Sequence, residues 1–232
     1  LTRSYCVQKI DRHELKQFIA QNTLLFGTQA QPGIMQTPNN EIVKFIYPRK
    51  TFSKTTLFPQ AANFEKNAQV LKDKGIIGPV VSTTVYCRAA NTYYIVYEKL
   101  AGEEIRHLCD QGQLQHLTDL ARYLADLHSK GIYFRALHLG NVLRLDNGEL
   151  ALIDIADLKS KSRSLSCLAR GRNIAHMLNV LEDKVHFQQF GLGQFLDDYF
   201  QQANLSDAER RLLVWRMRLR LHADMRDGLG TV

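Results

Sequence analysis

The sequence has few cysteines and no apolar run long enough to span a membrane. Its four cysteines, Cys6, Cys87, Cys109 and Cys167, are far apart and include no Cys-x-x-Cys pair. This spacing argues against a structural zinc site and against a disulfide framework, so we expect reduced thiols in the cytoplasm. No stretch approaches the roughly 20 apolar residues that a transmembrane helix needs. Residues 1–5 do not have the form of a signal peptide either.

The composition is that of a folded chain. Of the 232 residues 45% are hydrophobic, which suits one bilobal domain or two small ones. The formal net charge of +7 favours an anionic partner such as a nucleotide, a nucleic acid, an anionic lipid or a phosphorylated sugar. The basic residues are not interleaved with aromatic residues in a nucleic-acid-binding motif, so we expect no nucleic acid partner.

The most informative stretch contains two short apolar segments, Val142–Leu145 and Leu150–Ile153, separated by an Asn-Gly pair. This pattern predicts a β-hairpin. Asn141 directly precedes the first segment and Asp154 directly follows the second, so the hairpin would bring the two side chains together. Amide and carboxylate oxygens are ligands that Mg²⁺ prefers. We therefore predict a site for a hard cation at Asn141 and Asp154.

The first part of the chain has the pattern of a mixed α and β structure. Asp11 followed by Glu14 is a capping box, which predicts a helix over about residues 12–21. A second helix is predicted over residues 59–74, ending at Gly75. Five strands are predicted, as an antiparallel sheet, over residues 24–26, 33–35, 41–47, 80–87 and 93–97.

The second part is predicted to be mainly helical. An apolar stripe over Leu114–Lys130 predicts an amphipathic helix, on which Tyr123 and His128 are expected to be packing residues. Residues 160–172 are rich in Ser and Arg and are expected to form a loop. Further helices are expected over residues 174–181, over residues 194–202, and from the capping box at Ser206 to about Met225.

The chain resembles the protein-kinase-like fold. Two segments carry the resemblance, Leu137-His138-Leu139-Gly140-Asn141 and Leu152-Ile153-Asp154. They are similar to those of small bacterial kinases that phosphorylate lipopolysaccharide core sugars, and of toluene-tolerance-type proteins. The resemblance implies an α+β bilobal fold, with a five-stranded antiparallel N-lobe sheet in residues 1–97 and a mainly helical C-lobe in residues 98–232. It also implies that Asn141 and Asp154 bind Mg-ATP.

The same resemblance assigns roles to residues of the first part. Lys44 lies in an otherwise apolar strand and matches the lysine that contacts the ATP phosphates, while Glu65 would pair with it. Residues 98–102 resemble the hinge, where backbone groups at Glu98 and Leu100 would bind adenine. The alternatives are that Lys44 extends outward to solvent and that Glu65 is an ordinary residue of the helix surface.

Two positions depart from the kinase pattern. Ala136 stands where these enzymes carry the Asp that accepts the proton of the substrate hydroxyl. The glycine-rich loop retains only Gly27 and Gly33, so phosphate binding by its N–H groups is the weakest part of the pattern. His138 is a candidate to contact phosphate or to replace the missing base. The alternative is a structural histidine that is hydrogen-bonded within the loop.

Three functions follow from these residues. The first is an ATP-dependent phosphotransferase acting on a sugar hydroxyl of lipopolysaccharide core or a similar anionic glycolipid. Such an enzyme would be slow without the Asp, since a general base contributes typically about 10²–10⁴-fold. The second is a catalytically dead pseudokinase that serves as a nucleotide-binding scaffold or regulator in envelope biogenesis. The third transfers an adenylyl group from reversed ATP to a protein.

Two basic regions are candidates for contact with an anionic partner. The first is the loop expected over residues 160–172, with the lysine before it. It could hold a phosphorylated acceptor or be an ordinary solvated loop. Its basic residues are Lys159, Lys161, Arg163, Arg170 and Arg172. The second is the last predicted helix, which carries several arginines between Arg210 and Arg220. This helix could lie on anionic lipid at the inner membrane. Packing against the C-lobe, with the arginines reaching solvent, is the favoured interpretation.

Overall fold

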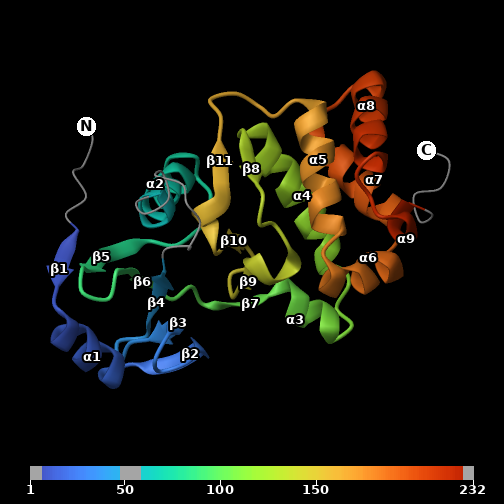
Figure 1. The fold of residues 1–232 in the computed structure, drawn as a ribbon. Coiled ribbons are helices and arrows are strands. Elements are labelled where there is room, and N and C mark those ends of the chain that lie inside the picture. The colour runs from blue at the N-terminus through green and yellow to red at the C-terminus, as the bar shows by residue number, and fades with distance from the viewer. Residues whose placement is uncertain (1–6, 48–58, 227–232) are drawn as a thin grey trace. The chain divides into compact units, whose positions relative to one another are not determined.

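The structure is a computed structural model that describes residues 7–47 and 59–226. These residues form an α+β protein with two compact units (Figure 1). The first unit contains the chain up to Asp73 together with Gly78–Leu100, and the second contains Lys74–Ile77 and the chain from Ala101 onward. The units therefore separate after Leu100 rather than between residues 97 and 98, and a short segment after the second helix belongs to the second unit.

A six-stranded mixed sheet forms the centre of the first unit, in the order β1-β5-β6-β4-β3-β2. The strands are β1 (Gln8–Ile10), β2 (Thr23–Gly27), β3 (Pro32–Gln36), β4 (Glu41–Ile46), β5 (Val81–Cys87) and β6 (Thr92–Glu98). The five predicted strands are present and pair antiparallel. The predicted sheet is nevertheless incomplete, because β1 adds to its edge, parallel to β5. This pairing uses backbone groups and leaves little pattern in a three-residue strand.

Helix α1 (Arg12–Gln21) covers one face of this sheet. Its capping box forms as predicted, with the N–H of Asp11 donating to Glu14 Oε2 at 2.7 Å and the N–H of Glu14 donating to Asp11 Oδ1 at 2.9 Å. Leu15 is buried in a core cluster with residues of four strands. Those residues are Met35, Val43, Phe45, Val85, Cys87, Tyr94 and Val96.

Helix α2 (Pro59–Asp73) packs on the opposite face. Its Phe64 is fully buried, and the Phe64 ring lies 5.4 Å from the ring of Tyr97, between centroids. Neighbouring residues of a strand point to opposite faces, and Val96 belongs to the cluster under α1. Tyr97 therefore points toward α2, so the two helices enclose the sheet from both sides.

The second unit combines two small sheets with a group of helices. One sheet has the order β10-β9-β7, and β11 pairs with β8 in the other. The strands are β7 (Gly102–Glu104), β8 (Ile132–Phe134), β9 (Val142–Leu145), β10 (Leu150–Leu152) and β11 (Leu158–Ser160). The α-helices are α3 (Ile105–Asp110), α4 (His116–Ser129), α5 (Cys167–Leu178), α6 (Lys184–Phe190), α7 (Leu192–Ala203), α8 (Asp207–Arg218) and α9 (Ala223–Arg226). The short 3-10 turns are η1 (Leu139–Asn141), η2 (Ile155–Asp157) and η3 (Leu181–Asp183).

Helix α4 is the buried support of the second unit, as its apolar stripe predicted. Every residue of the stripe is at most 1% exposed, namely Leu117, Leu120, Ala121, Leu124 and Leu127. His128 is also fully buried, with Nδ1 2.8 Å from the hydroxyl of Tyr199 and Nε2 3.2 Å from Asn173 Oδ1. Burial lowers the pKa of His128 to about 3, so this histidine is a neutral packing residue.

Three expectations for the second unit were wrong in part. Helix α5 begins at Cys167, so residues 167–172 are not the expected loop. Arg170 is only 3% exposed, and its guanidinium donates to Leu165 O at 2.9 Å and to the Tyr199 hydroxyl at 3.1 Å. A basic residue that turns inward gives no apolar signal in the sequence. Helix α6 was not expected, and α8 ends at Arg218 rather than near residue 225.

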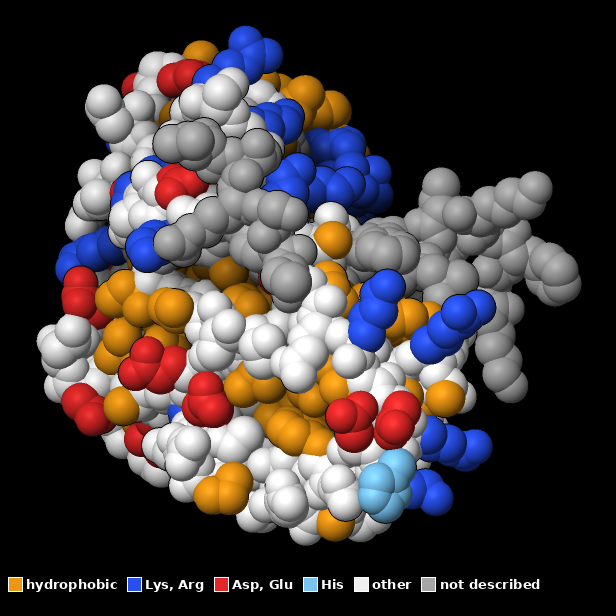
Figure 2. All heavy atoms as spheres, turned by 90° about the vertical axis from the view of Figure 1, so that its left-hand side faces the viewer, with side chains coloured by type: hydrophobic (Ala, Val, Ile, Leu, Met, Phe, Trp, Pro, Cys, Tyr) orange, Lys and Arg blue, Asp and Glu red, His pale blue; other side chains and the backbone are white. Residues whose placement is uncertain are grey.

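The surface carries charges of both signs. Figure 2 shows hydrophobic side chains in separate patches on one face, with basic and acidic side chains between them. The large hydrophobic residues exposed in the first unit are Leu25, Phe26 and Val80. No helix in the described ranges is long and apolar enough to cross a membrane.

His128 should make stability depend on pH. Between about pH 3 and about pH 6.5 the unfolded histidine binds a proton that the folded one does not, so the free energy of unfolding falls as the pH decreases through this window. One such group contributes at most about 1.4 kcal/mol per pH unit. His128→Gln cannot ionise, so denaturant titrations should show a smaller loss of stability between about pH 7 and about pH 5 than in the wild type. An equal loss in both proteins would contradict the prediction.

Candidate functional site

The predicted hairpin forms at the candidate metal site. Strands β9 and β10 pair antiparallel, and the N–H of Gly148 donates to Leu145 O at 2.8 Å to close the turn. Gly148 has a φ of 86°, which glycine adopts without steric cost. The pairing continues beyond the strands, because the N–H of Ile153 donates to the carbonyl of Asn141 at 3.0 Å. Asn141 therefore lies opposite the residue next to Asp154.

Asn141 is held in a defined orientation. Its side chain is buried, and its Nδ2 donates to the carbonyl of Ala136 at 2.8 Å. With the amide nitrogen used in this way, the Oδ1 atom faces elsewhere and accepts no hydrogen bond from the described residues. Oδ1 is thus the atom of Asn141 that remains for a cation.

Asp154 has an unusual backbone. Its φ of 52° and ψ of 46° place it in the left-handed region, which non-glycine residues rarely adopt and which Asp tolerates better than most. Such strained positions cluster at functional sites. The described part of the chain contains no group of three or more His, Cys, Asp or Glu side chains that could hold a metal. Metal binding by Asn141 and Asp154 stays a prediction.

His138 is engaged in hydrogen bonds inside the loop. Its Nδ1 accepts from the N–H of Gly140 at 3.1 Å and lies 3.2 Å from Nη2 of Arg106. Nδ1 must accept from both donors, so the neutral ring carries its proton on Nε2. Burial lowers the pKa of His138, and the charge of Arg106 lowers it further. These contacts support the structural alternative for His138, since neither ring nitrogen is a free base.

Three polar residues that the sequence analysis did not single out contact the loop between Phe134 and Asn141. They are Arg106, Asn173 and Asp183. The side chain of Asn173 accepts from the N–H of Phe134 at 3.2 Å and donates to the carbonyl of Phe134 at 2.8 Å. Asp183, which is fully buried, accepts from the N–H of Leu139 at 2.8 Å and from Arg106 Nε at 2.7 Å. Helix α5 also contains Arg170, Arg172 and His176, so no signal in the sequence distinguishes Asn173 as the residue that holds the loop.

The sheet register of the first unit places Lys44 and Glu65 on the same face. Lys44 in β4 lies opposite Ile95, and Ile95 lies opposite Thr84 in β5. Directly opposite residues share a face of a sheet. Glu65 of α2 is only 6% exposed and accepts a hydrogen bond from the Thr84 hydroxyl. Burial excludes the surface alternative for Glu65, while its ion pair with the half-buried Lys44 stays a prediction.

The expected hinge residues Glu98 and Leu100 and the loop between Gly27 and Gly33 lie in the first unit. Glu98 ends β6 and its N–H donates to Val80 O at 3.4 Å, and Leu100 is the last residue before the second unit. In the loop after Gly27, the N–H of Thr28 donates to Gln31 O at 3.2 Å and the reverse bond is 3.1 Å long. These two N–H groups are therefore not available to a phosphate, in agreement with the poor glycine pattern.

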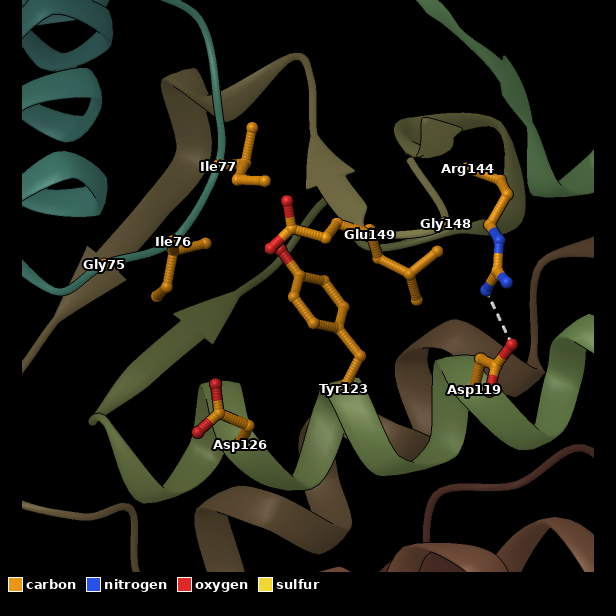
Figure 3. Close-up of a pocket in the computed structure, with 10 residues that line it drawn as sticks. Gly75, Ile76, Ile77, Asp119, Tyr123, Asp126, Arg144, Gly148 and Glu149 are labelled. Atoms are coloured by element: carbon orange, nitrogen blue, oxygen red, sulfur yellow. Dashed lines mark hydrogen bonds and ion pairs between the residues drawn. The ribbon is translucent and has the colours of Figure 1, made fainter. Parts of the chain in front are cut away.

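Tyr123 lines a hollow of about 370 Å³ in the second unit instead of being closely packed (Figure 3). Its hydroxyl is buried without a hydrogen-bond partner in the described structure. Burial, and then the charge of Asp126, raises the pKa of Tyr123. A bound water would satisfy such a hydroxyl.

Two of the three acidic side chains that line this hollow form ion pairs. Figure 3 shows Asp119 paired with Arg144, at 2.6 Å, on one side of Tyr123. On the other side, Asp126 pairs with Lys130 at 2.8 Å. Glu149 also lines the hollow and has no ion pair with a basic side chain among the described residues, so the lining as a whole is acidic.

Loss of the Thr84 hydroxyl should lower the stability of the fold. Thr84→Val removes the hydroxyl and leaves the buried carboxylate of Glu65 without this donor, which we expect to cost about 1–3 kcal/mol. Thr83→Val is the matched control, since the neighbouring residue of β5 points to the other face. Denaturant unfolding should show a clear loss for the first variant alone. Equal stability of the two variants would contradict the assigned bond.

Comparison with protein-family models gives no match for this chain, and comparison with curated proteins gives no significant match.

Proposed function

We propose that the protein is an ATP-dependent phosphotransferase of the protein-kinase-like fold. Its proposed substrate is a sugar hydroxyl of lipopolysaccharide core or a similar anionic glycolipid. The observation that carries the proposal is the hairpin, which brings Asn141 opposite Ile153, the residue before Asp154. The proposed cofactor is Mg-ATP, with Asn141 Oδ1 and the Asp154 carboxylate as the protein ligands of the ion.

The first unit supports the proposal as a kinase-like N-lobe. In this interpretation Lys44 neutralises charge on the ATP phosphates, and Glu65 orients Lys44. Thr84 supports this arrangement because it holds the Glu65 carboxylate on the face that carries Lys44. Backbone groups at Glu98 and Leu100 would receive the adenine edge.

The chemistry requires little from a protein base. The acceptor oxygen forms a bond to the γ-phosphorus, the bond to the bridging oxygen of ADP breaks, and the hydroxyl proton is lost. Phosphoryl transfer depends mostly on positioning and electrostatic stabilisation. Ala136 cannot accept the proton, and Nδ1 of His138 is already occupied, so the proton would pass to water. The expected enzyme is slow rather than inactive.

A catalytically dead pseudokinase is the second candidate, and Ala136 is the observation that favours it. In that case Asn141, Asp154 and Lys44 would bind nucleotide for a scaffolding or regulatory role in envelope biogenesis. The two candidates share nucleotide binding and differ only in transfer.

Helix α8 bears on the proposed location in the cytoplasm at the inner membrane. Its Leu213, Val214 and Met217 are buried, which agrees with packing against the rest of the second unit. Trp215 is 54% exposed and Leu219 is 56% exposed. These two side chains, among arginines, are the proposed peripheral contact with anionic lipid.

Nucleotide binding is tested by thermal unfolding with ATP, with and without magnesium. Ligand that binds the folded state raises the unfolding temperature. We expect magnesium-dependent stabilisation in the wild type and none in Asp154→Ala, because the carboxylate ligand is lost. Asp157→Ala, three residues further along the chain and exposed, should behave like the wild type. A wild type without stabilisation at millimolar nucleotide would overturn the nucleotide site.

A carboxylate introduced at position 136 distinguishes the slow phosphotransferase from the pseudokinase. In a slow kinase, Ala136→Asp should raise transfer to lipopolysaccharide core by up to about 10²–10⁴-fold, measured by mass analysis of the products. In a pseudokinase, the same variant should bind ATP and transfer nothing. A product heavier by an adenylyl group would instead show adenylyl transfer.

A second variant tests His138 in the same assay. His138→Asn keeps an acceptor for the N–H of Gly140 but has no basic nitrogen. Transfer should therefore be maintained in His138→Asn, and its loss in a stably folded variant would make His138 the working base.

A further inference from the structure

A basic pocket of about 240 Å³ lies in the second unit, next in the chain to the position of the missing Asp. Arg135, which directly precedes Ala136, contributes to it. The other lining residues are Tyr133, Arg172, His176, Asn179 and Arg220. They come from β8, the loop after it, α5 and the segment after α8.

The pocket concentrates positive charge without a counter-ion. Arg135, Arg172 and Arg220 have no ion pair with a carboxylate among the described residues, and no acidic side chain lines the pocket. Partial burial lowers the pKa of His176, and the charges of Arg135 and Arg172 lower it further, so these charges act on the same small volume. Like charges that converge repel each other, and a bound anion removes this cost.

The backbone around the pocket is fixed in advance. The side chain of Asn179 donates to the carbonyl of Arg220 at 2.8 Å and accepts from the N–H of His222 at 2.9 Å. These bonds attach the segment after α8 to the end of α5. Asn173 holds both backbone groups of Phe134, the residue before Arg135. The backbone at Arg135 and Arg220 is therefore held in place, while the guanidinium groups of Arg135, Arg172 and Arg220 are exposed to solvent and accessible to a ligand.

Arg172 is the one residue of the predicted basic loop that contributes to this pocket. Arg170 is buried and bonded to Leu165, Tyr199 and Ser164, so it has a structural role. The pocket instead combines Arg172 with two arginines from other segments.

We propose that this pocket binds a phosphate monoester, specifically an anionic group that the acceptor carries in addition to the hydroxyl that is phosphorylated. Guanidinium groups match the oxygens of a phosphate in paired hydrogen bonds. The position of Arg135 beside Ala136 would hold the acceptor at the loop that carries Asn141. The identity of the ligand as acceptor rests on the proposed function, whereas the anion site does not.

Binding of inorganic phosphate and of glucose 6-phosphate to the whole chain is measured by calorimetry without magnesium or nucleotide. We expect saturable binding that Arg172→Gln and Arg135→Gln each weaken by at least about tenfold. Arg163→Gln is the matched control, because it removes the same charge from an exposed residue outside the pocket and should change nothing. Absent binding, or equal binding by Arg172→Gln and Arg163→Gln, would overturn the site.

A second arm distinguishes a soluble source of the phosphate from a lipid source. Vesicles of phosphatidylcholine with and without phosphatidic acid present the same monoester on a membrane. If the phosphate belongs to a lipid, Arg172→Gln should lose the preference for phosphatidic acid while Arg163→Gln keeps it, and glucose 6-phosphate should compete. Equal preference in the two variants would exclude the lipid source, and absent soluble binding overturns the site whatever the vesicles show.

The outcome is separable from that of the proposed function. Asp154→Ala should retain phosphate binding, because Asp154 does not line the pocket. Phosphate binding without magnesium-dependent stabilisation by ATP would support the anion site and overturn the phosphotransferase. ATP stabilisation without phosphate binding would overturn the anion site alone.

Discussion

The loop between Phe134 and Asn141 is held by buried polar side chains, and the proposed chemistry depends on this constraint. Asn173 satisfies both backbone groups of Phe134, and Asp183 satisfies the N–H of Leu139. A buried polar group without its partner costs about 1–3 kcal/mol, so an alternative loop conformation would lose several such bonds together. The network therefore specifies one conformation for the segment that carries Ala136 and Asn141.

The same network extends into the helical core. Asn173 contacts His128 of α4, His128 contacts Tyr199 of α7, and Tyr199 accepts from Arg170 of α5. Each contact lies between fully buried or nearly fully buried side chains. The loop between Phe134 and Asn141 is thus coupled to the packing of three helices. A substitution that breaks its bonds should therefore lower the free energy of unfolding of the whole unit.

The backbone at Ala136, rather than its side chain, orients Asn141. The side chain of Asn141 is oriented by the carbonyl of Ala136, a backbone group that every residue at this position supplies. The orientation of Asn141, the proposed metal ligand, therefore does not depend on which side chain stands at position 136. In the first unit Thr84 has a comparable role, because it holds Glu65 on the face of Lys44 through strand register.

The sequence by itself determined the features that depend on neighbouring residues. The capping boxes at Asp11 and Ser206, the apolar stripe of α4 and the hairpin between Asn141 and Asp154 were all predicted, because their signals lie within a few residues. It also predicted the five antiparallel strands, although not their sixth neighbour β1.

Tertiary structure alone decided the features that join distant segments. Four features depend on residues that are far apart in the chain. Arg170 bonds to Tyr199, Asn173 to Phe134, and Asp183 to Leu139. Nδ1 of His138 contacts Arg106, and the basic pocket combines Arg135, Arg172 and Arg220. In the sequence a buried arginine and a solvated one look the same. Only folding determines which polar groups lose water, and those groups must then find partners wherever the chain brings them.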